Sequence, residues 1–255
     1  MSRPAEVESF LTPAPGAKTI RHAEIAGPMI DGLEPSEELR SVLEVRVPDL
    51  IAYQNTRYAE AYLDTVRTAL AAERSVLDHD GDFGLEVAKG LHKVMAYKDE
   101  YEVARLLLEA EAEAQLQAEF GEGIKVQWNL NPPMMRSFGV DRKLRLGAWF
   151  RPVLVGLRAA KRLRGTRVDV FGRAQVRRVE RSLVRHYSQM VQETCSRMTT
   201  DSFDDCVAIV RLAEVVRGYE HVKLGNVAQY LESADELCTK LGFSVDRDEH
   251  LRSVA

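Results

Sequence analysis

The segment from Val87 to Glu109, VAKGLHKVMAYKDEYEVARLLLE, has the periodicity of one long amphipathic helix. Its large apolar residues recur at helical spacing: Val87, Leu91, Val94, Tyr101 and Leu108. At about 100° per residue, the same face also carries charged residues. We therefore expect one α-helix here, with Lys98, Glu102 and Arg105 on the side that packs against the rest of the chain.

Charges on a buried helix face need partners. An unpaired buried cation costs several kcal/mol. Glu102 lies four residues from Lys98 and three from Arg105, within reach of both on a helix surface. The sequence thus predicts an ionic cluster inside apolar packing, and it leaves open whether the cluster is structural or binds a ligand or partner.

The rest of the chain predicts a mainly α fold. Helical patterns occur at 36–47, 48–74, 148–163, 169–198, 203–217 and 223–241, so that about seven helices are expected, the Val87 helix reaching about residue 120. Apolar and polar residues alternate from Ile124 to Leu130, which predicts a strand. A second short strand at 143–146 would complete a small two-stranded β-hairpin.

The first 35 residues differ in composition. They contain five of the nine prolines and no clear period, which indicates an extended leader or linker. Ser36 is a plausible N-cap for the first helix. We therefore expect residues 1–35 to be a leader and residues 36–255 to form one helical accessory domain.

The net charge of −4 hides a strong separation of sign. Between Arg142 and Arg185 there are 14 Lys or Arg residues and two acids, whereas Asp99–Glu122 holds eight acids and one base. Such separation indicates either internal packing of the two segments or a charged partner.

Two predicted helices carry arginines on one face. Arg177, Arg181 and Arg185 follow a four-residue spacing, and Arg151, Arg158 and Arg162 are similarly aligned. Aligned like charges cost about 0.2–0.5 kcal/mol per pair, so acidic groups should offset them. These groups belong either to the acidic helix of this chain or to a protein or anionic partner.

A third basic cluster surrounds a predicted helix junction. It consists of Arg217, His221 and Lys223, with Asn226 nearby. An anion could bind at the following helix N-terminus. Ordinary capping and surface charge explain the same residues.

Other functional classes are disfavoured. The chain is net negative, and Trp149, Phe150 and Phe171 suit a core better than base stacking, so nucleic acid is not expected. No apolar run approaches the roughly 20 residues of a membrane span, and no secretory signal is visible.

No catalytic or metal motif stands out. Three sparse cysteines, with no Cys-x-x-Cys pair, argue for a reducing cytoplasm. The six histidines lack metal-ligand spacing, and neither a G-x-x-x-x-G-K loop nor a strand followed by G-x-G-x-x-G occurs. We assign no catalytic residue and no metal site.

Four separated motifs suggest a family. VAKGLHKVMAYKDEYEVARLLLE, Pro132-Pro133, LRGTRVDVFGRAQVRRVERSLV and RGYEHVKLGNV occur in this order between about Ser36 and Leu241. Together they resemble the C-terminal region of long-chain indolepyruvate-type 2-oxoacid:ferredoxin oxidoreductases. At Val170 this chain departs from the family, which often has proline there.

The resemblance implies an accessory role in an oxidoreductase. Those enzymes decarboxylate 2-oxoacids with thiamine diphosphate and iron–sulfur clusters, which their upstream domains hold, and they reduce ferredoxin. We therefore expect a cytoplasmic assembly or docking domain, or separate subunit, that holds no cofactor, is not catalytic alone, and meets the catalytic domains or acidic ferredoxin. The alternatives are a purely structural cap and a stand-alone enzyme or binder of a 2-oxoacid or coenzyme A, held by Lys98, Arg105, His221 and Lys223.

Overall fold

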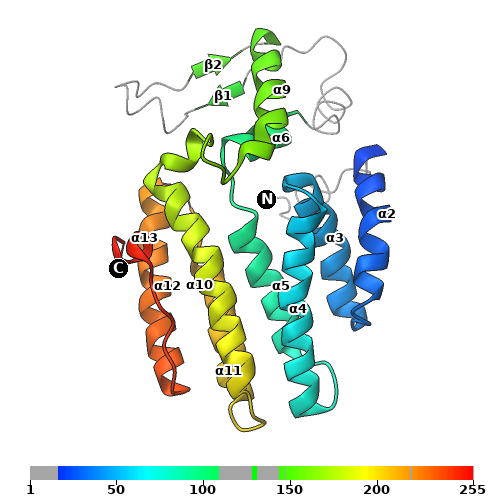
Figure 1. Ribbon diagram of the computed structural model, residues 1–255, viewed down its shortest axis with the longest axis vertical. Helices are drawn as coiled ribbons and strands as arrows, with labels where there is room; N and C mark the ends of the chain where they lie inside the picture. The colour runs from blue at the N-terminus through cyan, green and yellow to red at the C-terminus, as the bar shows by residue number, and fades with distance from the viewer. Residues whose placement is uncertain (1–16, 109–127, 131–143, 147, 219, 255) are drawn as a thin grey trace, which may run out of the picture. The chain divides into compact units, whose positions relative to one another are not determined.

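The computed structural model describes residues 17–108, 128–130, 144–146, 148–218 and 220–254, and this part of the chain is mainly helical, as predicted (Figure 1). It divides into two compact units. The larger unit consists of His22–Tyr97 and Gly165–Ala255, and the smaller unit of Lys98–Arg164 with Met1–Arg21. The smaller unit thus interrupts the larger one between Tyr97 and Gly165.

The larger unit is a helical bundle. Its helices are α2 (Ala17–Asp31, in this unit from His22 on), α3 (Glu37–Tyr53), α4 (Thr56–Leu77), α5 (Asp82–Met95), α10 (Gln175–Arg197), α11 (Phe203–Arg211), α12 (Glu220–Lys240) and α13 (Glu249–Arg252). Short 3-10 turns lie at Phe171–Arg173 and Leu212–Val215. The packing of α5 against α3, α4, α10 and α11 makes it the central helix.

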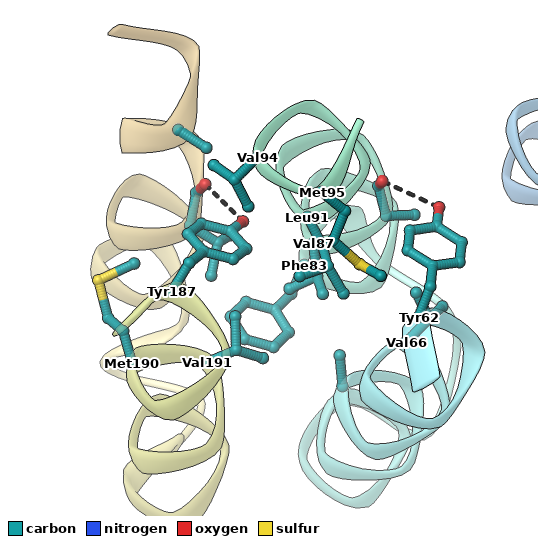
Figure 2. Close-up of a cluster of buried hydrophobic side chains, with 14 of the residues drawn as sticks. Tyr62, Val66, Phe83, Val87, Leu91, Val94, Met95, Tyr187, Met190 and Val191 are labelled. Carbon is teal, nitrogen blue, oxygen red and sulfur yellow. Dashed lines mark hydrogen bonds between the residues drawn. The ribbon is translucent and has the colours of Figure 1, made fainter. Parts of the chain in front are cut away.

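The core of the larger unit joins its two sequence segments. Figure 2 shows Tyr62 and Val66 of α4 and Phe83, Val87 and Leu91 of α5 in one apolar cluster with residues of α10. Two buried hydroxyls are satisfied by main-chain acceptors: Tyr62 donates to Ala88 O at 2.9 Å and Tyr187 donates to Val210 O at 2.9 Å. Apolar burial and the hydrogen bonds of these two hydroxyls thus act together in this core.

The prediction of one continuous helix from Val87 to beyond Glu109 is wrong. It ends at Met95, and α6 begins only at Glu100. Tyr58 donates its hydroxyl to Met95 O and Tyr53 donates to Tyr97 O, both at 3.1 Å. These bonds satisfy carbonyls that a continuous helix would have used, so the break is stable.

The leader and the first helix also differ from prediction. Residues 17–31 form α2 instead of an extended segment, and Ala26 and Ile30 are buried in the core of the larger unit. The first helix continues through Pro48 to Tyr53. Because Val47 and Leu50 are fully buried, packing outweighs the hydrogen bond that proline removes.

The smaller unit is built around α6 (Glu100–Leu107) and α9 (Arg151–Ala159), the latter flanked by 3-10 turns at Ala148–Phe150 and Ala160–Leu163. Its apolar cluster joins Ala104 and Leu108 to Leu154. Two three-residue strands, β1 (Trp128–Leu130) and β2 (Leu144–Leu146), pair antiparallel with Trp128 opposite Leu146. The expected hairpin connection, and residues 124–127 of its first strand, lie outside the described residues.

Candidate functional site: ionic clusters and the surface of α9

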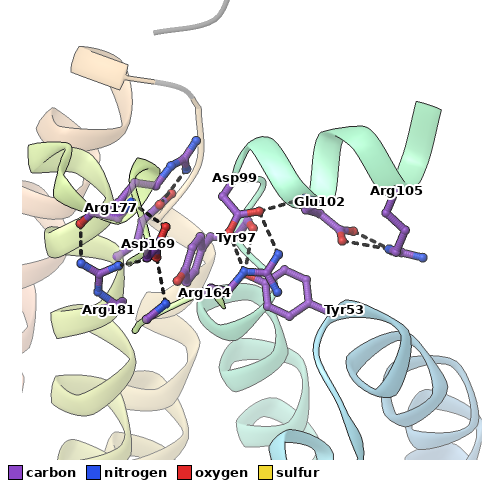
Figure 3. A network of polar contacts seen from close by, with 12 residues as sticks. Tyr53, Tyr97, Asp99, Glu102, Arg105, Arg164, Asp169, Arg177 and Arg181 are labelled. Carbon is purple, nitrogen blue, oxygen red and sulfur yellow. Dashed lines mark hydrogen bonds and ion pairs between the residues drawn. The ribbon is translucent and has the colours of Figure 1, made fainter. Parts of the chain in front are cut away.

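A buried ion pair marks the start of α6 (Figure 3). Asp99 accepts hydrogen bonds from Nε and Nη2 of Arg164 at 2.5 and 2.8 Å, and both side chains are buried. The same carboxylate caps α6 by accepting the Glu102 N–H at 2.8 Å. Sequence reasoning missed this pair, although an aspartate preceding a helical run is a recognised cap.

The predicted cluster on the Val87 helix forms only in part. Glu102 is buried and accepts from Nη2 and Nε of Arg105 at 2.6 and 2.8 Å, as Figure 3 shows. Placing Lys98 with them is wrong, since the chain has left the helix at this point and Lys98 is exposed. Lys161 lies near the pair instead: burial lowers its pKa first, and the charges of Arg105 and Arg164 lower it further.

The three arginines of α10 have partners inside the larger unit. Arg177 donates to Glu180 at 2.8 Å, and Lys223 donates to the other oxygen of Glu180 at 2.5 Å. Arg181 donates to Gly172 O and lies 3.5 Å from Asp169 (Figure 3). The helix predicted to begin at residue 169 begins instead at Gln175, as α10. The carboxylate of Asp169 accepts the N–H groups of Gly165 and Gly172.

Arg185 is the third aligned arginine of α10. It pairs with Asp248 at 2.7 Å, yet 68% of its side chain is exposed. The partners of Arg177, Arg181 and Arg185 described here lie outside the acidic segment 99–122, so the aligned charges are offset locally.

The junction before α12 brings cations together. Arg217 and His221 are exposed, and Asn226 donates to Arg217 O at 2.8 Å. Lys93 of α5, which the sequence did not single out, donates to Glu214 O at 2.6 Å. Burial, followed by the charges of Arg217 and Lys223, lowers the pKa of Lys93, against the opposing charge of Glu214. The cations of this junction thus influence one another.

A different surface lies on α9 in the smaller unit. Leu154 faces the apolar cluster, whereas Val153 and Val155 are exposed. Trp149, expected in a core, is 70% exposed and makes an edge contact with Phe150, their ring centroids 5.6 Å apart. Arg151 and Arg162 are exposed at the two ends of this segment. We call Trp149, Val153, Val155, Arg151 and Arg162 the α9 surface.

Among the described residues, no three His, Cys, Asp or Glu side chains group closely enough to hold a metal ion. Burial raises the pKa of Cys195 and Cys238 to about 12, so both thiols are protonated at neutral pH. No helix in the described part of the chain is long and apolar enough to cross a membrane.

The comparisons give a family without an activity. No curated protein and no solved structure matches this chain. A family model described as a family of unknown function, DUF6537, matches residues 39–236, which include most of the larger unit and all of the smaller unit after residue 97. The chain therefore belongs to the DUF6537 family.

Proposed function

We propose that this chain is a cytoplasmic docking domain whose α9 surface binds a protein with an apolar patch and an acidic rim. The observation that carries the proposal is that a tryptophan and two valines are exposed between residues 149 and 155, and that Arg151 and Arg162 are exposed in the same segment. Tryptophan and arginine are enriched among the residues that dominate binding energy at protein interfaces. The arginines are complementary to acidic residues, which would orient the partner and speed its association.

The resemblance to indolepyruvate-type 2-oxoacid:ferredoxin oxidoreductases suggests the partner. We propose that the domain docks with the catalytic domains or subunits of such an enzyme, which would hold the thiamine diphosphate and iron–sulfur clusters, and that it is not catalytic alone. Ferredoxin is the second proposed partner, because its acidic surface has the required charge. The arginines of α10 are less suited to this role, since Arg177 and Arg181 already have carboxylate partners.

Titration calorimetry against the catalytic subunits of a 2-oxoacid:ferredoxin oxidoreductase from the same organism would test the proposal. Val153→Asp should weaken binding at least about tenfold, which corresponds to about 1.4 kcal/mol. The matched control is Val45→Asp on α3, where the valine is 65% exposed, and it should bind as the unmodified chain does. Equal affinity of V153D and the unmodified chain would eliminate the α9 surface.

Salt provides the electrostatic test. Raising the ionic strength from about 0.01 M to about 0.15 M shortens the Debye length from about 30 Å to about 8 Å. Binding should weaken steeply over this range, and Arg162→Glu should reduce the dependence. Affinity that is flat with salt would eliminate the acidic partner.

The alternative is a binder of a small anion, such as a 2-oxoacid or coenzyme A. The junction of Lys93, Arg217 and Lys223 favours it, because three cations of this chain lie near one another there: burial lowers the pKa of Lys93 first, and the charges of Arg217 and Lys223 lower it further against the charge of Glu214. Of the residues first expected for this ligand, Lys98 and Arg105 belong to the smaller unit and His221 and Lys223 to the larger. A rise in melting temperature with pyruvate or coenzyme A, lost in Lys223→Gln, would support this alternative.

A further inference from the structure

A short loop of the larger unit, residues 165–173, exposes apolar and basic side chains together. Val168 and Val170 are 62% and 58% exposed, on either side of Asp169, which is buried. Arg167 and Arg173 are exposed in the same stretch. We call this stretch the 165–173 loop. It belongs to the larger unit, so it shares no residue with the α9 surface.

The buried carboxylate of Asp169 stiffens this loop. It accepts the Gly165 N–H at 2.8 Å and the Gly172 N–H at 2.9 Å, so it joins the two sides of the loop. Arg181 of α10 lies 3.5 Å from the same carboxylate and donates to Gly172 O, which ties the loop to the bundle (Figure 3). A Cβ on Gly172 would collide with the Asp169 carboxylate, so this arrangement needs glycine there. A loop that is ordered before binding loses less conformational entropy when a partner binds.

The charge around the loop is positive and is not balanced locally. Arg167, Arg173 and Arg178 are exposed, and none of them has an ion-pair partner among the described residues. The acids between residues 165 and 185 are Asp169 and Glu180, and both are buried. Glu180 already accepts from two other cations of the larger unit. The three arginines are therefore available to anionic groups of a partner.

The side chains of the loop indicate which class of partner fits. Val168 and Val170 lie between Arg167 and Arg173 in the sequence, so apolar and carboxylate groups are needed side by side. Membrane-binding surfaces use tryptophan, phenylalanine and leucine as apolar anchors, whereas the exposed apolar residues here are valines. Phe171 is half-buried, which does not suit stacking against nucleic-acid bases. A protein segment is therefore favoured over a membrane or a nucleic acid.

We propose that the 165–173 loop docks an acidic protein segment in which aspartate or glutamate flanks apolar residues. The apolar residues would cover Val168 and Val170, and the carboxylates would pair with Arg167, Arg173 and Arg178. This interaction goes beyond the docking proposed for the α9 surface. It uses residues of the other unit and requires no oxidoreductase partner.

Selection from a library of short random peptides displayed on phage tests the proposal, with the full chain as the target. Phage that bind the variant Val168→Asp are removed first, so that the recovered peptides depend on the loop. These peptides should be enriched in aspartate or glutamate next to apolar residues, because complementary charge and apolar contact act together. Recovery of no such peptides would overturn the proposal.

Variants then locate the binding site. A recovered peptide with a fluorescent label should bind V168D and Arg173→Glu at least about tenfold more weakly in fluorescence anisotropy, because like charges then face each other. Val45→Asp on α3 and Arg57→Glu on α4 make the same changes at other exposed positions of the larger unit and should leave the affinity unchanged. Val153→Asp should also bind the peptide normally, which separates this result from a failure of the α9 surface. Equal losses in the loop variants and the controls would overturn the proposal.

Two other occupants of the loop would give different results. Vesicles that contain phosphatidylserine should not co-sediment with the chain, and sedimentation velocity should show no self-association through the loop. Vesicle binding or self-association that Arg173→Glu abolishes, without any peptide selected, would assign the loop to a membrane or to a second copy of this chain. Either result would overturn the proposal.

Discussion

Glu73 shows how one residue can organise the start of a helix. Its side chain is fully buried, and its two oxygens accept the N–H groups of Phe83 at 2.7 Å and Gly84 at 3.3 Å. These are groups that α5 itself cannot satisfy. Glu73→Ala should lower the free energy of unfolding by at least about 2 kcal/mol, because buried donors lose their acceptor. Chemical denaturation would measure this loss, and Glu60→Ala, on an exposed position of the same helix, is the control.

The same carboxyl group predicts a pH dependence. Burial raises the pKa of Glu73, only partly opposed by the N–H groups of Phe83, Gly84 and Gly81, and Asp80 raises it further. The folded chain thus binds this proton more tightly than the unfolded chain does. The stabilisation from protonation is fully present below the ordinary value of about 4.3 and is lost as pH rises through the folded pKa. The effect of Glu73→Ala on the free energy of unfolding should therefore be larger near pH 4 than near pH 8, and the reverse order would contradict the assigned shift.

At the scale of elements, the contact between α5 and α10 depends on one glycine. A Cβ on Gly90 would lie 2.3 Å from the Tyr187 hydroxyl, which donates to Val210 O. Gly90→Ala should therefore destabilise the chain by about 1–3 kcal/mol through overpacking. Gly225→Ala in α12, where a Cβ meets nothing within 4 Å, should instead stabilise by up to about 1 kcal/mol. Thermal melts of the two variants should move in opposite directions, and equal shifts would refute the packing argument.

The ion pair between Asp99 and Arg164 joins the two ends of the segment 98–164 in the smaller unit. Arg164→Leu leaves a buried carboxylate without its cation, which should cost about 3–5 kcal/mol in the smaller unit. Hydrogen exchange of α6 and α9 amides would report the loss, and adding Asp99→Asn should recover part of it. The exposed pair of Arg67 and Asp64 is the control, because its removal should cost less than about 1 kcal/mol. Unchanged exchange in R164L would show that the pair contributes little.

Periodicity predicted the long helices but not where one of them stops. The pattern of Val87, Leu91 and Val94 correctly gave a buried helical face, because side chains three or four residues apart meet locally. The break at Met95 depends on hydroxyls of Tyr53 and Tyr58, about forty residues earlier, and no local pattern contains that information. Because the helix was expected to continue past Met95, Lys98 was wrongly predicted to lie beside Glu102 and Arg105.

Contacts between the candidate site residues were likewise predictable only where the two residues are close in sequence. Glu102 and Arg105 pair within one helical turn, so spacing alone predicted their contact. Arg185 meets Asp248, 63 residues later, and His186 meets Tyr230, 44 residues later, so both contacts depend on how helices pack. Neither contact was therefore visible in the sequence.

For the whole molecule, the smaller unit is an insertion whose ends lie close together. Asp99 and Arg164 share two hydrogen bonds, so the chain leaves and re-enters the larger unit at nearby points. Among the described residues, the buried members of the main core lie between 26 and 95 and between 179 and 251, and the second cluster lies between 104 and 157. Each unit thus buries its own apolar residues, which is the condition for folding alone.

Replacing residues 98–164 with a Gly-Ser linker should therefore leave the larger unit folded. About six linker residues reach up to about 20 Å, enough to join neighbouring ends. Circular dichroism should keep the helical spectrum of α2–α5 and α10–α13, with one cooperative thermal transition. The shortened chain should lose binding at the α9 surface, since that surface is removed. A non-cooperative melt would show that the two units depend on each other.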